Sequence, residues 1–93
     1  GYDNGRFGPE DPITREQLAT VLHRYARWKG YHTSKQDTLN QYSDRAQISL
    51  YAREAMAWAV AEGLLNGRTT NRLSPGETAS RAECAEILMR LLQ

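Results

Sequence analysis

Two arginines stand at equivalent and electrostatically unusual places in this chain. Arg15 and Arg81 each follow a hydroxyl residue, Thr14 or Ser80, that is expected to cap a helix. A cation in the first helical turn faces the positive end of the helix macrodipole, which disfavours it by ~0.3–1 kcal/mol at an exposed site. Backbone N–H groups at a helix start, together with a guanidinium fork, can bind a carboxylate or a phosphate. The pattern therefore predicts an anion site at these helix starts.

A second interpretation of the same arginines stays open at this point. Each guanidinium could instead pair with an acidic residue elsewhere in the fold, or extend into water. Internal ion pairs with no open crevice beside them would leave no place for the anion.

The segments that carry these arginines are related to each other. GYDNGRFGPEDPITREQLATVLHRYA (residues 1–26) aligns without a gap with GRTTNRLSPGETASRAECAEILMRLL (residues 67–92). Loop, cap and helix match in one register, which two unrelated helices would not do. A repeat of this length indicates units that bury their apolar faces against each other.

Apolar spacing predicts an all-α fold with three principal helices joined by long loops, at 14–29, 50–62 and 80–92. The first and last helices open with capping boxes, Thr14 with Gln17 and Ser80 with Glu83. No alternating run of β-branched residues predicts a strand. We expect the first and last helices to pack beside each other and the alanine-rich middle helix to cover both. The contacts would come from Leu18, Val21, Leu22 and Tyr25 on one helix and from Cys84, Ile87, Leu88 and Leu91 on the other.

Composition excludes several classes of protein. The 93 residues suffice for one domain, and 12 basic against 11 acidic residues do not give the basic surface of a nucleic-acid module. No apolar run approaches the roughly 20 residues that span a bilayer. The sequence contains no set of nucleophile, base and acid and no phosphate-binding glycine loop, so no motif in it indicates an enzyme. Residues 1–12 look like a turn-rich loop and not like a signal peptide, so we expect a piece of a longer protein.

Neither a metal nor a cofactor is predicted. Cys84 is the only cysteine and falls on the apolar stripe of the last helix, so we expect a buried structural thiol. His23 and His32 have no second ligand at helical spacing and are expected at the surface. Tyr51 and Trp58 are seven residues apart on one helix face, where they could stack on a sugar or pack in the core.

The second half of the chain combines several motifs in one order. These are an aromatic-x-Asp opening at Tyr42 and Asp44, the pair Tyr51-Ala52, the turn Gly63-x-x-x-Gly67, Pro75, and the helix start Ser80-Arg81-Ala82-Glu83. Together they resemble one complete repeat of the S-layer homology family over residues 42–93. Residues 1–29 resemble the second half of a preceding repeat, and residues 30–41 are a polar connection. We expect the whole to fold as a single domain.

The resemblance implies a module that holds bacterial surface proteins non-covalently on the cell wall, and therefore an extracellular location. Family members bind an anionic secondary cell-wall polysaccharide, typically carrying pyruvate ketals, in grooves between three repeats, whereas this chain carries about one and a half. The family's Thr-Arg-Ala-Glu arginine maps onto Arg15 and Arg81, its opening aspartate onto Asp44, and its turn glycines onto Gly63 and Gly67. The arginines would pair with the carboxylate of the sugar, and Asp44 would accept hydrogen bonds from its hydroxyl groups. Backbone N–H groups near Gly63 and Gly67 would complete the binding site. The implied ligand-binding residues are Arg15, Asp44, Tyr51, Gly63, Asn66, Gly67 and Arg81.

A different class of function competes with this one. Because one and a half repeats leave a helix face short of partners, the chain could instead serve as a protein–protein interaction or self-association module without binding a glycan. Oligomeric state and retention on wall polymer separate the two.

Overall fold

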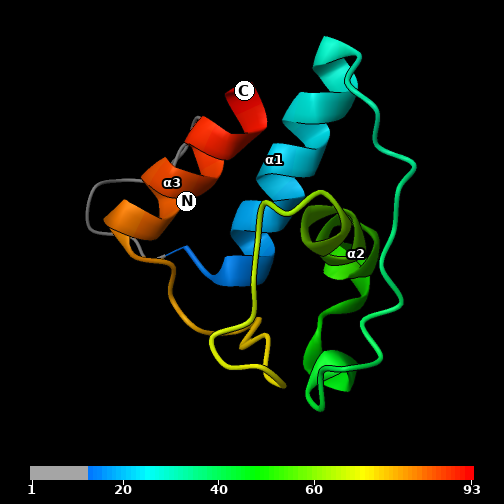
Figure 1. The fold of residues 1–93 in the computed structure, drawn as a ribbon, viewed down its shortest axis with the longest axis vertical. Helices are drawn as coiled ribbons and strands as arrows, with labels where there is room; N and C mark the ends of the chain where they lie inside the picture. The colour runs from blue at the N-terminus through cyan, green and yellow to red at the C-terminus, as the bar shows by residue number, and fades with distance from the viewer. Residues whose placement is uncertain (1–12) are drawn as a thin grey trace.

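A computed structural model describes residues 13–93 of the chain, and within this range all regular structure is helical (Figure 1). Helix α1 spans Arg15–Lys29, α2 spans Arg53–Ala61 and α3 spans Arg81–Leu92. Two 3₁₀ turns, η1 at Arg45–Gln47 and η2 at Leu50–Ala52, precede α2. Residues 13–93 contain isolated β-bridges and no strand. The predicted all-α class is confirmed, and the predicted middle helix begins as the 3₁₀ turn η2.

Both predicted capping boxes are present. Thr14 and Gln17 exchange side chain–backbone hydrogen bonds at the start of α1, and Ser80 with Glu83 does the same for α3. At the other end of α1, Gly30 adopts the left-handed conformation with φ of 81°. Its N–H and that of Tyr31 donate to carbonyls of the last turn, Arg27 O and Ala26 O. Local sequence therefore determines where α1 starts and stops.

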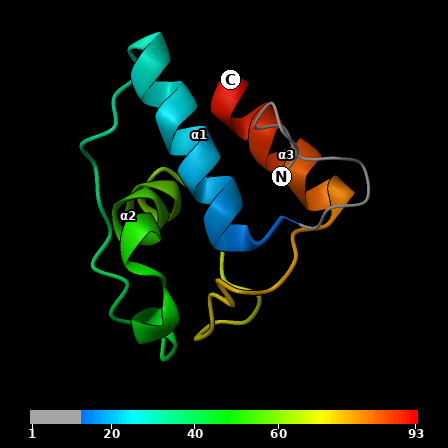
Figure 2. The same cartoon turned by 180° about the vertical axis from the view of Figure 1, so that it is seen from behind.

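The order of the helices in space differs from the prediction. In two opposite views α1 lies between α2 and α3, so the expectation that the middle helix covers both others is wrong (Figures 1 and 2). The reason is that α1 is buried over much of its surface, whereas α3 has one buried residue, Ile87. Val21 and Leu88, both expected in the contact between α1 and α3, are instead exposed.

Helix α2 is enclosed by α1 on one side and by the polar connection on the other. Every residue from 55 to 59 is buried, with Trp58 only 1% exposed. The Asp37 N–H donates to Ala57 O at 3.0 Å, and Trp58 Nε1 donates to His32 O at 3.3 Å. The small side chains of α2 allow this close approach of backbone on both sides. Trp58 is thus a core residue and not a sugar platform.

Two further side-chain predictions can be compared with the structure. His23 is buried against Trp58, with ring centroids 5.1 Å apart, so its expected surface position is wrong, whereas His32 is exposed as expected. Among the described residues, no partner reaches His23 Nε2. Cys84 is half-buried against the core, and burial, with the nearby Glu83 carboxylate, raises the pKa of its thiol. An inert thiol fits that pKa.

Within residues 13–93, no group of three or more histidine, cysteine or acidic side chains is placed to hold a metal ion. The helices described here are also too short or too polar to cross a membrane.

Candidate functional site

The start of α1 is fixed against the segment that leads into α3. Arg15 N–H donates to Glu77 O at 2.9 Å, and Glu16 N–H donates to Pro75 O at 3.0 Å. Ala79 N–H donates in return to Ile13 O at 2.8 Å. These bonds satisfy N–H groups that a helix start otherwise leaves without partners. The backbone N–H groups of Arg15 and Glu16 are therefore bonded within the protein and do not form the anion site that was expected there.

The Arg15 side chain is enclosed in the same region. Its guanidinium is 2% exposed and forms an ion pair with Glu83. Nε donates to Leu73 O at 2.8 Å, and Nη2 donates to Asn66 O. Burial lowers the pKa of Arg15, and the Glu83 carboxylate opposes that shift. Of the two interpretations of Arg15, the structure shows the internal ion pair.

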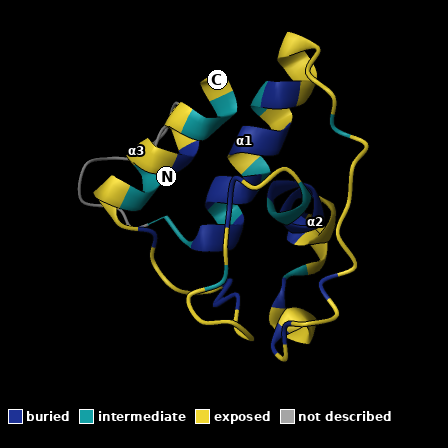
Figure 3. Ribbon diagram, viewed as in Figure 1, coloured by how far each residue is buried: buried dark blue, intermediate teal, exposed yellow. Residues whose placement is uncertain are grey.

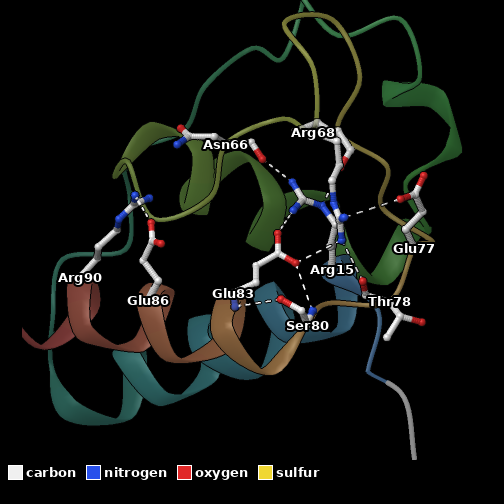
Figure 4. A network of polar contacts seen from close by, with 10 residues as sticks. Arg15, Asn66, Arg68, Glu77, Thr78, Ser80, Glu83, Glu86 and Arg90 are labelled. Atoms are coloured by element: carbon white, nitrogen blue, oxygen red, sulfur yellow. Dashed lines mark hydrogen bonds and ion pairs between the residues drawn. The ribbon is translucent and has the colours of Figure 1, made fainter.

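Glu83 joins the two helix starts and the loop between them (Figure 4). Its Oε1 accepts from Ser80 N–H in the capping box and from Arg68 Nη2 at 3.1 Å, while its Oε2 accepts from Arg15. Arg68 also donates to Thr78 O at 2.8 Å. One carboxylate thus holds α3, α1 and the loop after Gly67 in fixed relative positions.

A groove of about 440 Å³ opens beside this network, between the loop and α3. Arg15 contributes to its floor, and Asn66 and Gly67 form part of one wall. Helix α3 lines the groove from its N-cap Ser80 to Arg90 in its last turn, so the positive end of the helix dipole lies at one end of the groove. The lining residues are Arg15, Leu64, Leu65, Asn66, Gly67, Arg68, Ser80, Ala82, Glu83, Glu86, Ile87 and Arg90.

Two partly exposed guanidinium groups lie at the groove. The Arg68 side chain is 39% exposed and the Arg90 side chain 37% exposed. Arg90 pairs with Glu86 and donates to Gly63 O at 3.3 Å. A guanidinium has five N–H donors, so both groups can bind an incoming anion while they keep a protein partner. Arg68 and Arg90, and not Arg15, are the cations that solvent and ligand can reach in this groove.

Of the residues predicted to bind ligand, three line the groove: Arg15, Asn66 and Gly67. Gly63 lies just outside it and is linked to it through Arg90. The N–H groups of Gly63, Leu64 and Leu65 bond back to α2, whereas no bond within residues 13–93 involves the N–H groups of Asn66 and Gly67. A side chain at Gly67 would not fit, because a Cβ there would lie 2.5 Å from Thr69 O.

Asp44 is placed apart from the groove. It is 2% exposed, and its two carboxylate oxygens accept from Leu73 N–H at 2.9 Å and Ser74 N–H at 2.8 Å. Burial alone would raise the pKa of Asp44, but these backbone hydrogen bonds outweigh it and lower the pKa below its usual value. The carboxylate orients the loop at Leu73, whose carbonyl in turn receives Arg15. Its contribution to the groove is thus indirect.

Tyr51 and Arg81 also lie outside the groove lining. Tyr51 is 59% exposed and donates its hydroxyl to the buried Glu16 at 3.3 Å. Partial desolvation, with the charge of Glu16, raises the pKa of Tyr51. Arg81 is exposed at the start of α3. The structure therefore does not gather the predicted residues into one site, although it brings three of the seven to one groove.

Sequence reasoning missed Arg68 and Arg90. A signal for each was present, since Arg68 directly follows the turn glycine Gly67, and Arg90 occupies the position of Arg24 in the internal repeat. Neither signal distinguishes a groove residue from an ordinary surface arginine. What places them together is the turn at Gly63, whose φ of 74° directs the chain from α2 back along α3.

Comparison with known proteins gives one family. The model of the S-layer homology domain matches residues 1–19 and 41–85. The chain is 30% identical over 99% of its length to an endoglucanase of Bacillus sp. (strain KSM-635), and 33% identical over 98% to an amylopullulanase of Thermoanaerobacterium thermosulfurigenes. It is 28% identical over its whole length to the cellulosome-anchoring protein of Acetivibrio thermocellus.

The chain corresponds to a small part of each of these relatives. It spans 10% of the endoglucanase, 5% of the amylopullulanase and 20% of the cellulosome-anchoring protein. No solved structure matches it significantly.

Proposed function

The chain belongs to the S-layer homology family, and from this premise we propose that its groove beside α3 binds an anionic cell-wall polysaccharide. The family and its cell-surface relatives make the chain a surface-anchoring module that acts outside the bacterial cell. What remains to be derived is how this particular chain recognises the wall.

The observation that carries the proposal is the pair of accessible guanidinium groups in the groove. Arg68 approaches from the loop and Arg90 from α3, while the first turn of α3 adds the positive end of its dipole. Glu83 and Glu86 neutralise part of this charge and keep both arginines oriented. A preoriented guanidinium loses little rotamer entropy when it binds, which favours recognition of a planar carboxylate.

Pyruvate ketals on a wall sugar provide such a carboxylate. We propose that the ketal carboxylate accepts hydrogen bonds from Arg68 or Arg90, and that the N–H groups of Asn66 and Gly67 bind an oxygen of the same sugar. Hydrogen bonds to charged groups are worth about 1.5–3 kcal/mol each, so loss of either arginine should weaken binding measurably. Binding involves no covalent step, and the proposal includes no catalysis by this segment.

Retention on purified pyruvylated wall polymer tests this proposal. An Arg68→Gln/Arg90→Gln variant should bind at least tenfold more weakly, which corresponds to about 1.4 kcal/mol. The matched control, Arg45→Gln/Arg53→Gln, removes the same charge from exposed positions outside the groove and should bind like the wild type. Equal retention of both double variants would refute the groove as the binding site.

A separate comparison tests whether the pyruvate carboxylate is the group of the polymer that the protein recognises. The same polymer after mild acid removal of pyruvate should lose most of its affinity for the wild type. Affinity for the untreated polymer should also fall as the salt concentration is raised about tenfold, from roughly 0.05 to roughly 0.5 M, because added ions screen partly exposed charges. Undiminished binding to the depyruvylated polymer would mean that the carboxylate is not the recognised group.

A second function rests on the exposed face of α3. Leu88, Met89 and Leu92 are 44%, 63% and 56% exposed, and apolar groups at that density favour association with another protein surface. Light scattering at two concentrations separates this self-association or docking role from glycan binding. A concentration-dependent dimer without retention on wall polymer favours it, and a monomer that binds the polymer excludes it.

A further inference from the structure

Charge is distributed very unevenly along the chain. Residues 17–36 contain no aspartate or glutamate, and they contain four basic residues, Arg24, Arg27, Lys29 and Lys35. The whole chain has a net charge of +1, so all the other residues together carry a net charge of 1 − 4 = −3. The described residues outside this range carry seven basic and eight acidic side chains, so the last turns of α1 and the connection that follows form the basic part of a structure that is otherwise close to neutral.

The same part of the molecule carries an exposed aromatic group, which we call the aromatic platform: Tyr25, Trp28 and Tyr31. Trp28 is 79% exposed and Tyr31 is 38% exposed. The Tyr25 ring lies 6.1 Å from that of Trp28 and 6.3 Å from that of Tyr31, so it contacts both. Lys29 Nζ lies 5.6 Å from the Trp28 ring centre. The three rings are therefore neighbours on one surface, with Tyr25 between the other two.

Backbone geometry places Tyr31 on this platform. Gly30 turns the chain with φ of 81°, and the Tyr31 N–H then donates to Ala26 O at 2.9 Å. This bond brings Tyr31 back beside the helix that it has just left. The C-terminal end of α1 projects past the other helices and is largely exposed, as Figures 1 and 3 show.

A continuous path connects the platform with the groove. A second hollow, of about 530 Å³, is lined by Tyr31, His32, Glu62, Arg90 and Gln93, among others. It shares Leu64 and Arg90 with the groove that holds Arg68. Arg15 and Trp28 are 13 residues apart on one helix, which corresponds to about 20 Å along its axis. A chain molecule of several sugar units could contact both ends, whereas a single sugar could not.

We propose that the aromatic platform is a second glycan subsite, which stacks on sugar rings of the same anionic polymer that the groove holds; this rests on the function proposed above. Basic residues around the platform complement the negative charge of that polymer, and the rings supply the flat apolar faces that pyranose C–H groups contact. The polymer would run from the groove past Arg90 and over the second hollow to Trp28.

Part of the basic character has a simpler origin, and the proposal does not depend on it. Arg27 and Lys29 stand in the last turn of α1, where cations interact favourably with the helix dipole. That effect explains the two charges but not a tryptophan left 79% exposed between them. A second protein could cover Trp28 as well, and for that reason the test includes oligomeric state.

The test measures how four forms of the protein bind a long and a short piece of the wall glycan. The forms are the wild type, Trp28→Ala, Trp28→Phe, and Leu50→Ala as a control at an equally exposed apolar residue, 79% in both cases. The probes are pyruvylated wall polymer and a single-repeat fragment of it. Trp28→Ala should weaken binding of the polymer roughly two- to tenfold, since aromatic contacts contribute about 0.5–1.5 kcal/mol. It should leave the fragment unaffected, and Trp28→Phe should retain most of the affinity.

Fluorescence gives an independent measurement in the same samples. Trp58 is 1% exposed, so the emission that acrylamide quenches comes from Trp28. The polymer should reduce this quenching in the wild type, and the single-repeat fragment should not. Because Trp28→Phe retains only the buried indole, it gives the baseline.

Three results would overturn the subsite. If Trp28→Ala binds like Leu50→Ala while Arg68→Gln/Arg90→Gln binds weakly, the groove binds the polymer and the platform is not a subsite. If the wild type is not retained on the polymer at all, the proposed function fails and the subsite fails with it. If Trp28→Ala abolishes a concentration-dependent dimer without changing retention, the surface belongs to a protein partner.

Discussion

At the scale of single residues, Arg15 and Arg81 show how one motif position can have two different surroundings. Both stand directly after a capping hydroxyl residue, but Arg15 is enclosed by Glu83, Leu73 and Asn66, whereas Arg81 is exposed. Burial of a guanidinium is costly unless its donors are satisfied, and at Arg15 an ion pair and two carbonyls satisfy them. The first arginine is therefore a structural residue that shapes the groove, and a loss of binding on its substitution would not identify a ligand contact.

Substitution of the two arginines should separate these roles. Arg15→Ala leaves Glu83 without its buried partner and should lower the free energy of unfolding by about 3 kcal/mol. The value lies at the lower end of the range for buried pairs because Arg68 still contacts Glu83. Urea unfolding followed by circular dichroism measures the change.

Arg81→Ala is the matched control, since it makes the same change at the equivalent position of the repeat. It should alter stability by less than about 0.5 kcal/mol, as expected for a surface substitution. Equal losses in the two variants would contradict the assignment of Arg15 as the enclosed arginine.

The sequence could suggest these arginines but not their partners. A capping box involves residues three apart, so Thr14 with Gln17 and Ser80 with Glu83 were predictable from local spacing. The ion pair between Arg15 and Glu83 joins residues 68 positions apart. No local pattern indicates such a pair, and for that reason the sequence left two interpretations of Arg15 open.

At the scale of elements, the loop from 64 to 72 shapes the groove. Its turn depends on Gly67, where an added Cβ would lie 2.7 Å from both Arg72 O and a Tyr42 ring carbon. Arg68 N–H closes the turn by donating to Arg72 O at 2.9 Å. The backbone thus approaches itself so closely that only glycine fits, and this closeness sets the direction of Arg68.

Gly67→Ala should lower the free energy of unfolding by about 1–3 kcal/mol, because the extra methyl forces backbone and the Tyr42 ring apart. Retention on wall polymer should fall as well, since one wall of the groove moves. Chemical denaturation and retention on the polymer measure the two effects.

Gly76 provides the comparison, because nothing lies within 4 Å of a Cβ added there. Gly76→Ala should therefore leave stability and retention close to those of the wild type. A Gly67→Ala variant as stable as Gly76→Ala would show that the turn accommodates a side chain and is not tightly closed.

Elements differ in how well their sequence predicts them. Helix ranges followed from apolar spacing and caps, both of which are local. Their order in space did not, because the alanine-rich α2 was expected to cover both other helices, whereas α1 lies between α2 and α3 in the structure. His23 shows why: its imidazole is buried against Trp58, and a polar residue on a helix gives no sign that its face is covered. The division of the chain at residues 30–41 into a half repeat and a complete repeat stays a prediction.

At the scale of the whole molecule, the three helices are held unequally. Helix α2 buries five consecutive residues and α1 buries seven in all, whereas α3 buries Ile87 alone. Helices with few buried contacts open locally at lower free energy than the global unfolding. The groove is therefore built against the least firmly held helix of the described residues.

Amide hydrogen exchange should show this difference directly. In the free protein, protection should be greatest in α1 and α2 and clearly lower in α3. Addition of wall polymer should raise protection in the first turns of α3, because a ligand that binds the closed form opposes local opening. Uniform protection in all three helices, or no change in α3 with polymer bound, would contradict this account.

The uneven distribution of charge also affects how the molecule first meets a wall. Residues 17–36 carry four cations and no anion, whereas the other described residues carry seven basic and eight acidic side chains, so this structure has an uneven charge distribution and hence an electrical dipole. An anionic surface orients such a dipole during diffusion, before any contact forms, and increases the rate of productive encounters. The exposed end of α1 would then arrive first and the groove would follow, so that attachment proceeds from one end of the module to the other.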